Sequence, residues 1–193
     1  MEDLEPPILS RLPLGIQSFE DLRKRNALYI DKTDFVYKLV GSATKSYFLA
    51  RPRRFGKSLL CNTLRAYFEG KRELFEGLKI YNWEKNWTKY PILYLDFADG
   101  DYSIGSLTLV NKIRTALIDF EASNNISFDD SSIIIDKESD PLKNEAMKLS
   151  FRLESDLKAV YEKTGLGTVF IADEYDNPLI KSANLDTDKV IYR

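Results

Sequence analysis

The sequence contains no histidine and a single cysteine, Cys61. Without histidine, the chain cannot build a Ser-His-Asp or Cys-His nucleophilic site, or a zinc site with histidine ligands. A lone cysteine cannot form a disulfide within the chain, which is typical of a protein from a reducing compartment. The groups that remain for chemistry are carboxylates, lysines, arginines, tyrosines and backbone amides. Phosphoryl transfer uses this set of groups.

Long apolar runs and a strong excess of one charge are also lacking. No apolar run approaches the ~20 residues that a membrane-spanning helix needs. The net charge is −2, so the chain as a whole has no strong attraction to nucleic acid or to an acidic membrane. The amino terminus, MEDLEPPILSRLPLGI, is acidic and broken by prolines, unlike a signal or transit peptide. We therefore expect a cytoplasmic protein without a membrane partner, in which any anion site is local.

Apolar, β-rich segments alternate with amphipathic segments along the 193 residues. This alternation predicts an α/β domain with a mostly parallel sheet, in which chemistry gathers at the carboxyl ends of the strands. We expect a loose leader over 1–11 and one domain over 12–193. The predicted strands are 46–50, 90–99 and 167–178, and the predicted helices are 18–26, 34–41, 57–70, 106–122 and 144–165.

Three further features refine the predicted elements. Ser18 is expected to cap the first helix, and Thr33 the second, after an extended segment over 27–33. Residues 123–143 are polar and acidic, which favours an irregular insertion. Four aromatic residues precede the middle strand, and core packing and base stacking are both open for them. They are Tyr81, Trp83, Trp87 and Tyr90.

The stretch FLARPRRFGKSLL, residues 48–60, joins the first predicted strand to an amphipathic helix. A Gly-Lys-Ser sequence in this setting is typical of a phosphate-binding loop. Gly56 lets the backbone approach a phosphate, Lys57 would bridge the terminal phosphates, and the Ser58 hydroxyl would bind Mg²⁺. The amides that follow and the helix dipole add positive charge at the same place. The predicted nucleotide-binding residues are Arg53, Arg54, Phe55, Gly56, Lys57, Ser58 and Leu59.

One position of this loop departs from the usual phosphate-loop pattern. Arg51 stands where the first glycine is usual, and Pro52 biases its backbone toward an extended conformation. Arg53 and Arg54 are candidates for phosphate contacts or for salt bridges beside the loop. A basic turn that only caps a helix remains the alternative interpretation of the whole stretch.

The predicted strand TVFIADEYD ends in a cluster of acids. In phosphate-loop ATPases, the aspartate at such a strand end orients the water shell of Mg²⁺, and the glutamate after it polarises the attacking water. Asp173 is therefore the predicted metal residue, and Glu174 and Lys57 are the predicted catalytic residues. A buried strand that leaves the core through acids is the alternative. Asp96 and Asp99 are candidates to assist the metal or are simply a solvated strand end.

Together, LPLGIQSFEDLRKRNALYIDKTDFVYKLV, FLARPRRFGKSLLCNTLRAYFEGKRELFEGLKI, YPILYLDF and FIADEYDNP resemble the bacterial AAA-ATPase-like family. The family's loop reads Arg-Pro-Arg-Arg-Phe-Gly-Lys-Ser, so the resemblance accounts for the arginine at the first-glycine position. It implies a P-loop NTPase fold (AAA/ASCE-like) with a three-layer parallel sheet, ATP and Mg²⁺ as cofactors, and Asp173–Glu174 as the Walker B pair. Similar proteins often continue into a PD-(D/E)XK nuclease-like region, through which nucleic acid would be a partner.

In the five-stranded core of this ATPase class, the phosphate-loop strand lies between the fourth and fifth strands in sequence, and the Walker B strand is the third. Residue 193 comes about 20 positions after Glu174, so we expect a fragment whose sheet is incomplete at its C-terminal end. The leading function is ATP binding with Mg²⁺-dependent hydrolysis that needs residues beyond 193. The alternatives are a nucleotide-binding switch without turnover and a nucleic-acid-interacting module.

Overall fold

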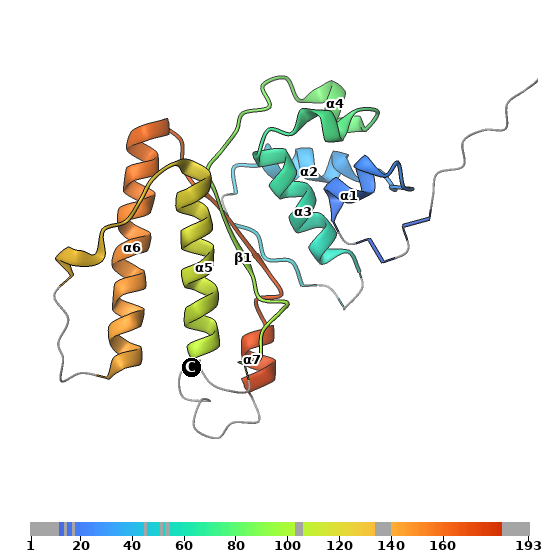
Figure 1. Cartoon of the computed structure of the whole chain (residues 1–193). Helices are drawn as coiled ribbons and strands as arrows, with labels where there is room; N and C mark the ends of the chain where they lie inside the picture. Colours follow the sequence, from blue (N-terminus) through green and yellow to red (C-terminus); the bar gives the residue numbers. More distant parts are fainter. Residues whose placement is uncertain are drawn as a thin grey trace, which may run out of the picture. The chain divides into compact units, whose positions relative to one another are not determined.

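The computed structural model describes residues 12–13, 15–16, 18–44, 46–50, 52, 55–102, 106–133 and 140–182 (Figure 1). The predicted leader over 1–11 lies outside these residues. The chain divides into two compact units, here called the first unit (1–88) and the second unit (89–193). Each unit has a core of its own.

The first unit begins with two short helices whose starts are set by side-chain caps. α1 (Phe19–Lys24) follows Ser18, whose hydroxyl accepts a 3.3 Å hydrogen bond from the Asp21 amide, so the predicted cap is confirmed. α2 (Thr33–Val40) ends at Gly41, also as predicted. Thr33 does not cap this helix. The Asp31 carboxylate accepts from both the Thr33 amide (2.9 Å) and the Thr33 hydroxyl (2.7 Å), because a charged carboxylate is the stronger acceptor.

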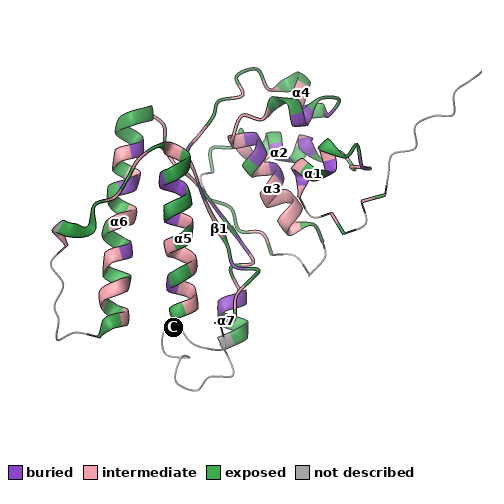
Figure 2. Ribbon diagram, in the orientation of Figure 1, coloured by how far each residue is buried: buried purple, intermediate pink, exposed green. Residues whose placement is uncertain are grey.

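The remaining helices of the first unit are α3 (Lys57–Phe68), η1 (Arg72–Phe75) and α4 (Lys79–Trp83). The start of α3 agrees with the prediction, and its last turn ends just before Gly70, which has φ +70°. Buried side chains from all of these helices form one core (Figure 2). The core residues are Phe19, Val36, Ala66, Tyr67, Leu74, Phe75, Leu78 and Ile80.

Aromatic rings dominate this core. The Phe75 ring lies 5.0 Å from the rings of both Phe19 and Trp87, measured between centroids. Tyr81 lies 6.4 Å from Trp87. The predicted packing role is thus confirmed for these two members of the aromatic group, whereas Trp83 lies at the surface against Tyr37.

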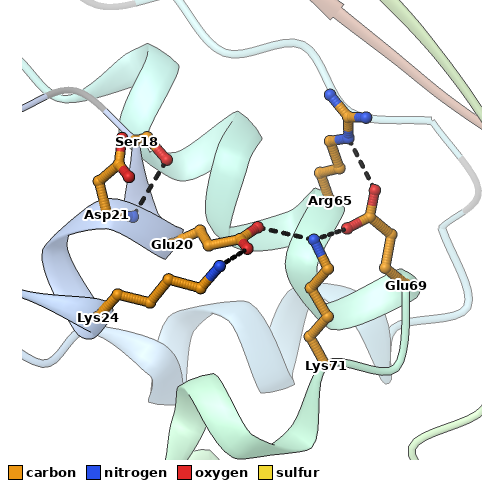
Figure 3. Close-up of polar contacts among 7 residues, drawn as sticks. All are labelled: Ser18, Glu20, Asp21, Lys24, Arg65, Glu69 and Lys71. Atoms are coloured by element: carbon orange, nitrogen blue, oxygen red, sulfur yellow. Dashed lines mark hydrogen bonds and ion pairs between the residues drawn. The ribbon is translucent and has the colours of Figure 1, made fainter.

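Ion pairs join α1 to the end of α3 (Figure 3). The Glu20 carboxylate binds Lys24 at 2.6 Å and Lys71 at 2.7 Å, and Lys71 also binds Glu69 at 2.7 Å. Arg65 on α3 completes the network with a 2.9 Å bond to Glu69. Hydrogen bonds from Lys24 and Lys71 lower the pKa of Glu20 to about 2. The network therefore holds α1 against the C-terminal end of the helix that carries the Gly-Lys-Ser sequence.

The strand predicted over 46–50 is not formed. These residues carry no strand assignment, and the Phe48 side chain is 73% exposed. A strand needs a partner backbone for its ladder. In the ATPase class that the sequence resembles, the partners of this strand come later in the chain than the Walker B strand. The part of the chain that the structure describes contains no such strand.

The second unit is built on a parallel pair of strands, β1 (Ile92–Asp96) and β2 (Val169–Asp173). Their register runs from Ile92 opposite Val169 to Asp96 opposite Asp173. β2 is only half buried: Ile171 and Asp173 face inward, whereas Phe170 is exposed. The strand predicted over 167–178 is therefore shorter than expected and is buried on one face only.

Two long helices connect β1 to β2. α5 (Ser106–Asn124) packs on β1, and α6 (Pro141–Thr164) lies beside α5 (Figure 1). α6 begins three residues before its predicted start, because Asp140 caps it through a 2.8 Å bond to the Leu142 amide and Pro141 suits the first helical position. It ends at Gly165, which has φ +68°. The core of this unit consists of Leu93, Val110, Leu117, Phe120, Leu149 and Val160.

The predicted insertion between these helices contains only the short η3 (Asp130–Ser132) among its described residues, and α7 (Asn177–Ser182) follows β2. The observed architecture is α/β, with a two-stranded parallel sheet in the described residues rather than the full three-layer sheet. None of the described helices combines the length and the apolar character that crossing a membrane requires.

Candidate functional site

The phosphate-loop candidate lies at the start of α3. Gly56 precedes the helix with φ +75° and ψ +24°, a left-handed backbone conformation that residues other than glycine rarely adopt. Its carbonyl accepts the first helical hydrogen bond, from the Leu60 amide at 3.0 Å. The amides of Lys57, Ser58 and Leu59 come before that bond, so they have no acceptor within the helix. Gly56 therefore turns the backbone so that a row of amides begins at the predicted site.

The first turn of α3 favours an anion. It contains no acidic residue and begins with Lys57. Asn62 and Thr63 donate to the carbonyls of Ser58 (2.8 Å) and Leu59 (2.7 Å), so these polar side chains bind carbonyl oxygens of the first turn. The helix dipole adds partial positive charge at the same end. This end of α3 is thus chemically suited to a phosphate.

Some of the other predicted loop residues are described by the structure, and some are not. Phe55 is 64% exposed, and Lys57, Ser58 and Leu59 are partly buried. Arg53 and Arg54, together with Arg51, lie outside the described residues. Their predicted contacts with phosphate therefore stay predictions.

The acidic candidate lies at the carboxyl end of β2. Asp173 is the last residue of the strand and is only 5% exposed. Its carbonyl accepts from the Phe97 amide (3.1 Å), and its Oδ1 accepts from the Glu174 amide (3.0 Å). Glu174 has φ +50°, so the chain turns sharply just after the strand. Because of this turn, the Glu174 side chain does not continue the alternating in-and-out pattern of the β2 side chains.

Asn177 holds that turn and is a residue whose role the sequence did not reveal. Its amide donates to the Glu174 carbonyl (2.9 Å), and its buried side chain donates to the Phe97 carbonyl (3.1 Å). The second bond links the turn after β2 to the residue that follows β1. An asparagine between an acidic run and Pro178 was the available signal, although it also fits an ordinary helix start.

Asp96 lies at the same sheet edge, in register with Asp173. It is exposed, and its Oδ1 accepts a 2.8 Å bond from the Ala98 amide. Asp99 is exposed as well. These features favour the solvated strand end over a metal-assisting role for both residues.

The structure brings together the members of each half of the predicted site. Gly56, Lys57 and Ser58 meet at one helix start, in the first unit, and Asp173 and Glu174 meet at one strand end, in the second unit. A magnesium ion shared by Ser58 and Asp173 would join residues of different units, and it stays a prediction.

The residues present fit a nucleotide with Mg²⁺. In the described residues, no three Asp, Glu or Cys side chains cluster closely enough to hold a metal by themselves. Mg²⁺ that accompanies a nucleotide needs no such cluster, because phosphate oxygens and water fill most of its shell and the protein adds one or two ligands. A hydroxyl such as that of Ser58 and a carboxylate such as that of Asp173 are groups of the kind that can serve as these ligands.

Known proteins resemble parts or most of this chain. A curated protein of Azotobacter chroococcum mcd 1, described as an uncharacterized protein in the vnfD 5' region, is 43% identical over 93 residues. The match covers 47% of this chain and 17% of that protein, so the chain spans a minor part of this relative. No solved structure matches the chain. The family model described as "Predicted AAA-ATPase" matches residues 13–192, and the chain therefore belongs to the AAA-ATPase-like family.

Proposed function

We propose that the chain binds ATP with Mg²⁺ through the loop that ends in Gly56-Lys57-Ser58, and that Glu174 supports hydrolysis of the bound ATP. The observation that carries the proposal is the left-handed Gly56 at the start of α3, in front of a first turn without acidic residues. Membership of the AAA-ATPase-like family supports the choice of ATP.

Each residue has a defined task in this proposal. The amides of Lys57, Ser58 and Leu59 hold the phosphates, and the Lys57 ammonium bridges the terminal ones, with Phe55, Arg53 and Arg54 completing the loop. Mg²⁺, when bound by Ser58 and Asp173, neutralises charge on the transferred phosphoryl group. Glu174 orients and polarises the attacking water. Burial of Asp173 and the bond that its Oδ1 accepts from the Glu174 amide favour a fixed orientation of the Asp173 carboxylate.

The proposal also covers the chain segments needed for hydrolysis, the cellular location and a partner. We propose that hydrolysis needs chain segments beyond residue 193, since the described sheet has two strands. A cytoplasmic location is proposed from the single cysteine, and a nucleic-acid partner rests on the family resemblance alone.

Binding can be tested by titrating the chain with a fluorescent ATP analogue, with and without Mg²⁺. Lys57→Ala should abolish binding, and Lys38→Ala, at an exposed lysine in the last turn of α2, should leave it unchanged. Equal loss in both variants, or retained binding in Lys57→Ala, would contradict the proposed loop.

Turnover needs a separate measurement, by phosphate release from a protein that contains the downstream region. Glu174→Gln should keep nucleotide binding and lose turnover, because the amide cannot accept the proton of the attacking water. A switch without turnover would show binding but no phosphate release in any variant. A nucleic-acid module would show steeply salt-dependent DNA binding with which ATP does not compete.

A further inference from the structure

A buried group of three charged residues connects α5 and α6 in the second unit. Arg152 on α6 binds Glu121 on α5 through two hydrogen bonds, Nε to Oε1 at 2.5 Å and Nη2 to Oε2 at 2.9 Å. Asp156 lies one helical turn after Arg152 and is 1% exposed. Glu121 and Asp156 are buried and the Arg152 side chain is 19% exposed, so their charges are only weakly screened by water.

The group holds two carboxyls and one guanidinium. Arg152 binds Glu121 through one edge of its guanidinium, formed by Nε and Nη2. The buried Oδ2 of Asp156 receives no hydrogen bond within the described residues. Burial, the charge of Glu121 and a hydrogen bond with Glu121 raise the pKa of Asp156 to about 7. The charged groups around Asp156 are Glu121 from α5, Arg152 from α6 and, acting through Arg152, Asp130 from η3.

We propose that Glu121, Arg152 and Asp156 form a pH-sensitive latch between α5 and α6. The latch is closed when Asp156 is protonated, because its carboxylic acid then donates to the Glu121 carboxylate while Arg152 neutralises that carboxylate. When Asp156 ionises, two buried carboxylates share a single guanidinium, and their repulsion opposes the packing of the two helices.

The direction of the pH effect follows from the raised pKa. The folded state holds the Asp156 proton up to about pH 7, whereas an unfolded aspartate releases it near pH 4. The stabilising contribution of the closed latch is therefore complete below about pH 4. It is lost as the pH rises from there to about 7.

The latch shares a residue with a neighbouring cavity. Arg152 also lines a cavity of about 390 Å³, together with Arg114, Glu145 and Lys148 among others. Arg114 and Lys148 are both paired with Glu145. Arg152 therefore belongs both to the latch and to the charged wall of this cavity.

The test is urea unfolding of the whole chain between pH 4 and 8, followed for the second unit. In the wild type, the unfolding equilibrium constant should rise by up to about tenfold per pH unit up to about pH 7, in addition to the contribution of other groups. Asp156→Asn should remove this rise and should be more stable than the wild type at pH 8, because the amide donates to Glu121 without ionising. Asp119→Asn, at an exposed aspartate of α5, is the matched control and should keep the wild-type profile.

A second measurement keeps the proposal testable if the variant folds poorly. Carboxyl ¹³C NMR of the wild-type chain should show the Asp156 resonance titrating near pH 7, far above the exposed aspartates. A midpoint near pH 4, or an Asp156→Asn variant with the wild-type pH profile, would overturn the proposed latch.

Discussion

Replacing Gly56 by alanine would separate the backbone role of this residue from its role at the phosphate site. Apart from its chain neighbours, an ideal Cβ built on Gly56 meets no atom of the described residues within 4 Å, so the substitution causes no clash with them. The cost comes from φ +75° alone. A left-handed backbone costs a residue with a side chain roughly 1–2 kcal/mol. Reduced freedom of the unfolded chain offsets about 0.4–1 kcal/mol of this cost. We therefore expect a net loss of about 1 kcal/mol in the free energy of unfolding.

Gly77 provides the matched control, because it lies in the same unit, also has φ +75°, and also has open space where a Cβ would stand. Gly77→Ala and Gly56→Ala should reduce the free energy of unfolding by similar amounts. Only Gly56→Ala should weaken binding of the fluorescent ATP analogue, because its methyl group occupies space that a phosphate needs. We expect a loss of at least about tenfold in affinity, which corresponds to about 1.4 kcal/mol.

Urea unfolding and nucleotide titration should be measured on both variants under the same conditions. Together they distinguish an effect on stability from an effect at the phosphate site. Equal weakening of nucleotide binding in both variants would show that lost stability, rather than the phosphate site, explains the effect. An unchanged free energy of unfolding in both variants would refute the argument from the left-handed backbone.

Three other substitutions test the first unit. Phe75→Ala should reduce the free energy of unfolding by about 3–5 kcal/mol in urea, because the ring is fully buried against Phe19 and Trp87; a loss below about 1 kcal/mol would contradict this packing. Thr33→Val should cost about 1–3 kcal/mol in the same assay, since the buried Ile80 amide loses its acceptor. Glu20→Gln should reduce stability by at most about 1 kcal/mol, because the ion pairs are partly exposed. The wild-type advantage over Glu20→Gln should be present above about pH 4.5 and disappear as the pH falls toward about 2, and an advantage that persists in acid would contradict the lowered pKa.

Features with a local cause could be predicted from the sequence. The Ser18 cap, the end of α2 at Gly41 and the start of α3 at Lys57 depend on residues within a few positions of each other. Local hydrogen bonds and backbone preferences decide such boundaries. The left-handed backbone of Gly56 was not predicted in this way, because a residue before a helix is usually extended.

Features that depend on distant partners could not be predicted in the same way. The segment 46–50 has the composition of a strand, yet a ladder requires a neighbouring strand that the composition does not provide. Glu121 and Arg152 are 31 positions apart and meet only because α5 and α6 pack side by side. Asn177 acts on the Phe97 carbonyl across the sheet edge, 80 positions away, so its contribution to the strand end became visible only in the fold.

The backbone of Glu174, just after β2, adopts an unfavourable left-handed conformation. At φ +50°, the turn alone would favour asparagine or glycine, for which the left-handed region carries little steric penalty. A glutamate at this position is held against its conformational preference, and neighbouring bonds from Asn177 and Asp173 must hold it there. Replacing Glu174 by asparagine or glycine would therefore lower the backbone cost of this turn and would remove the carboxylate at the strand end.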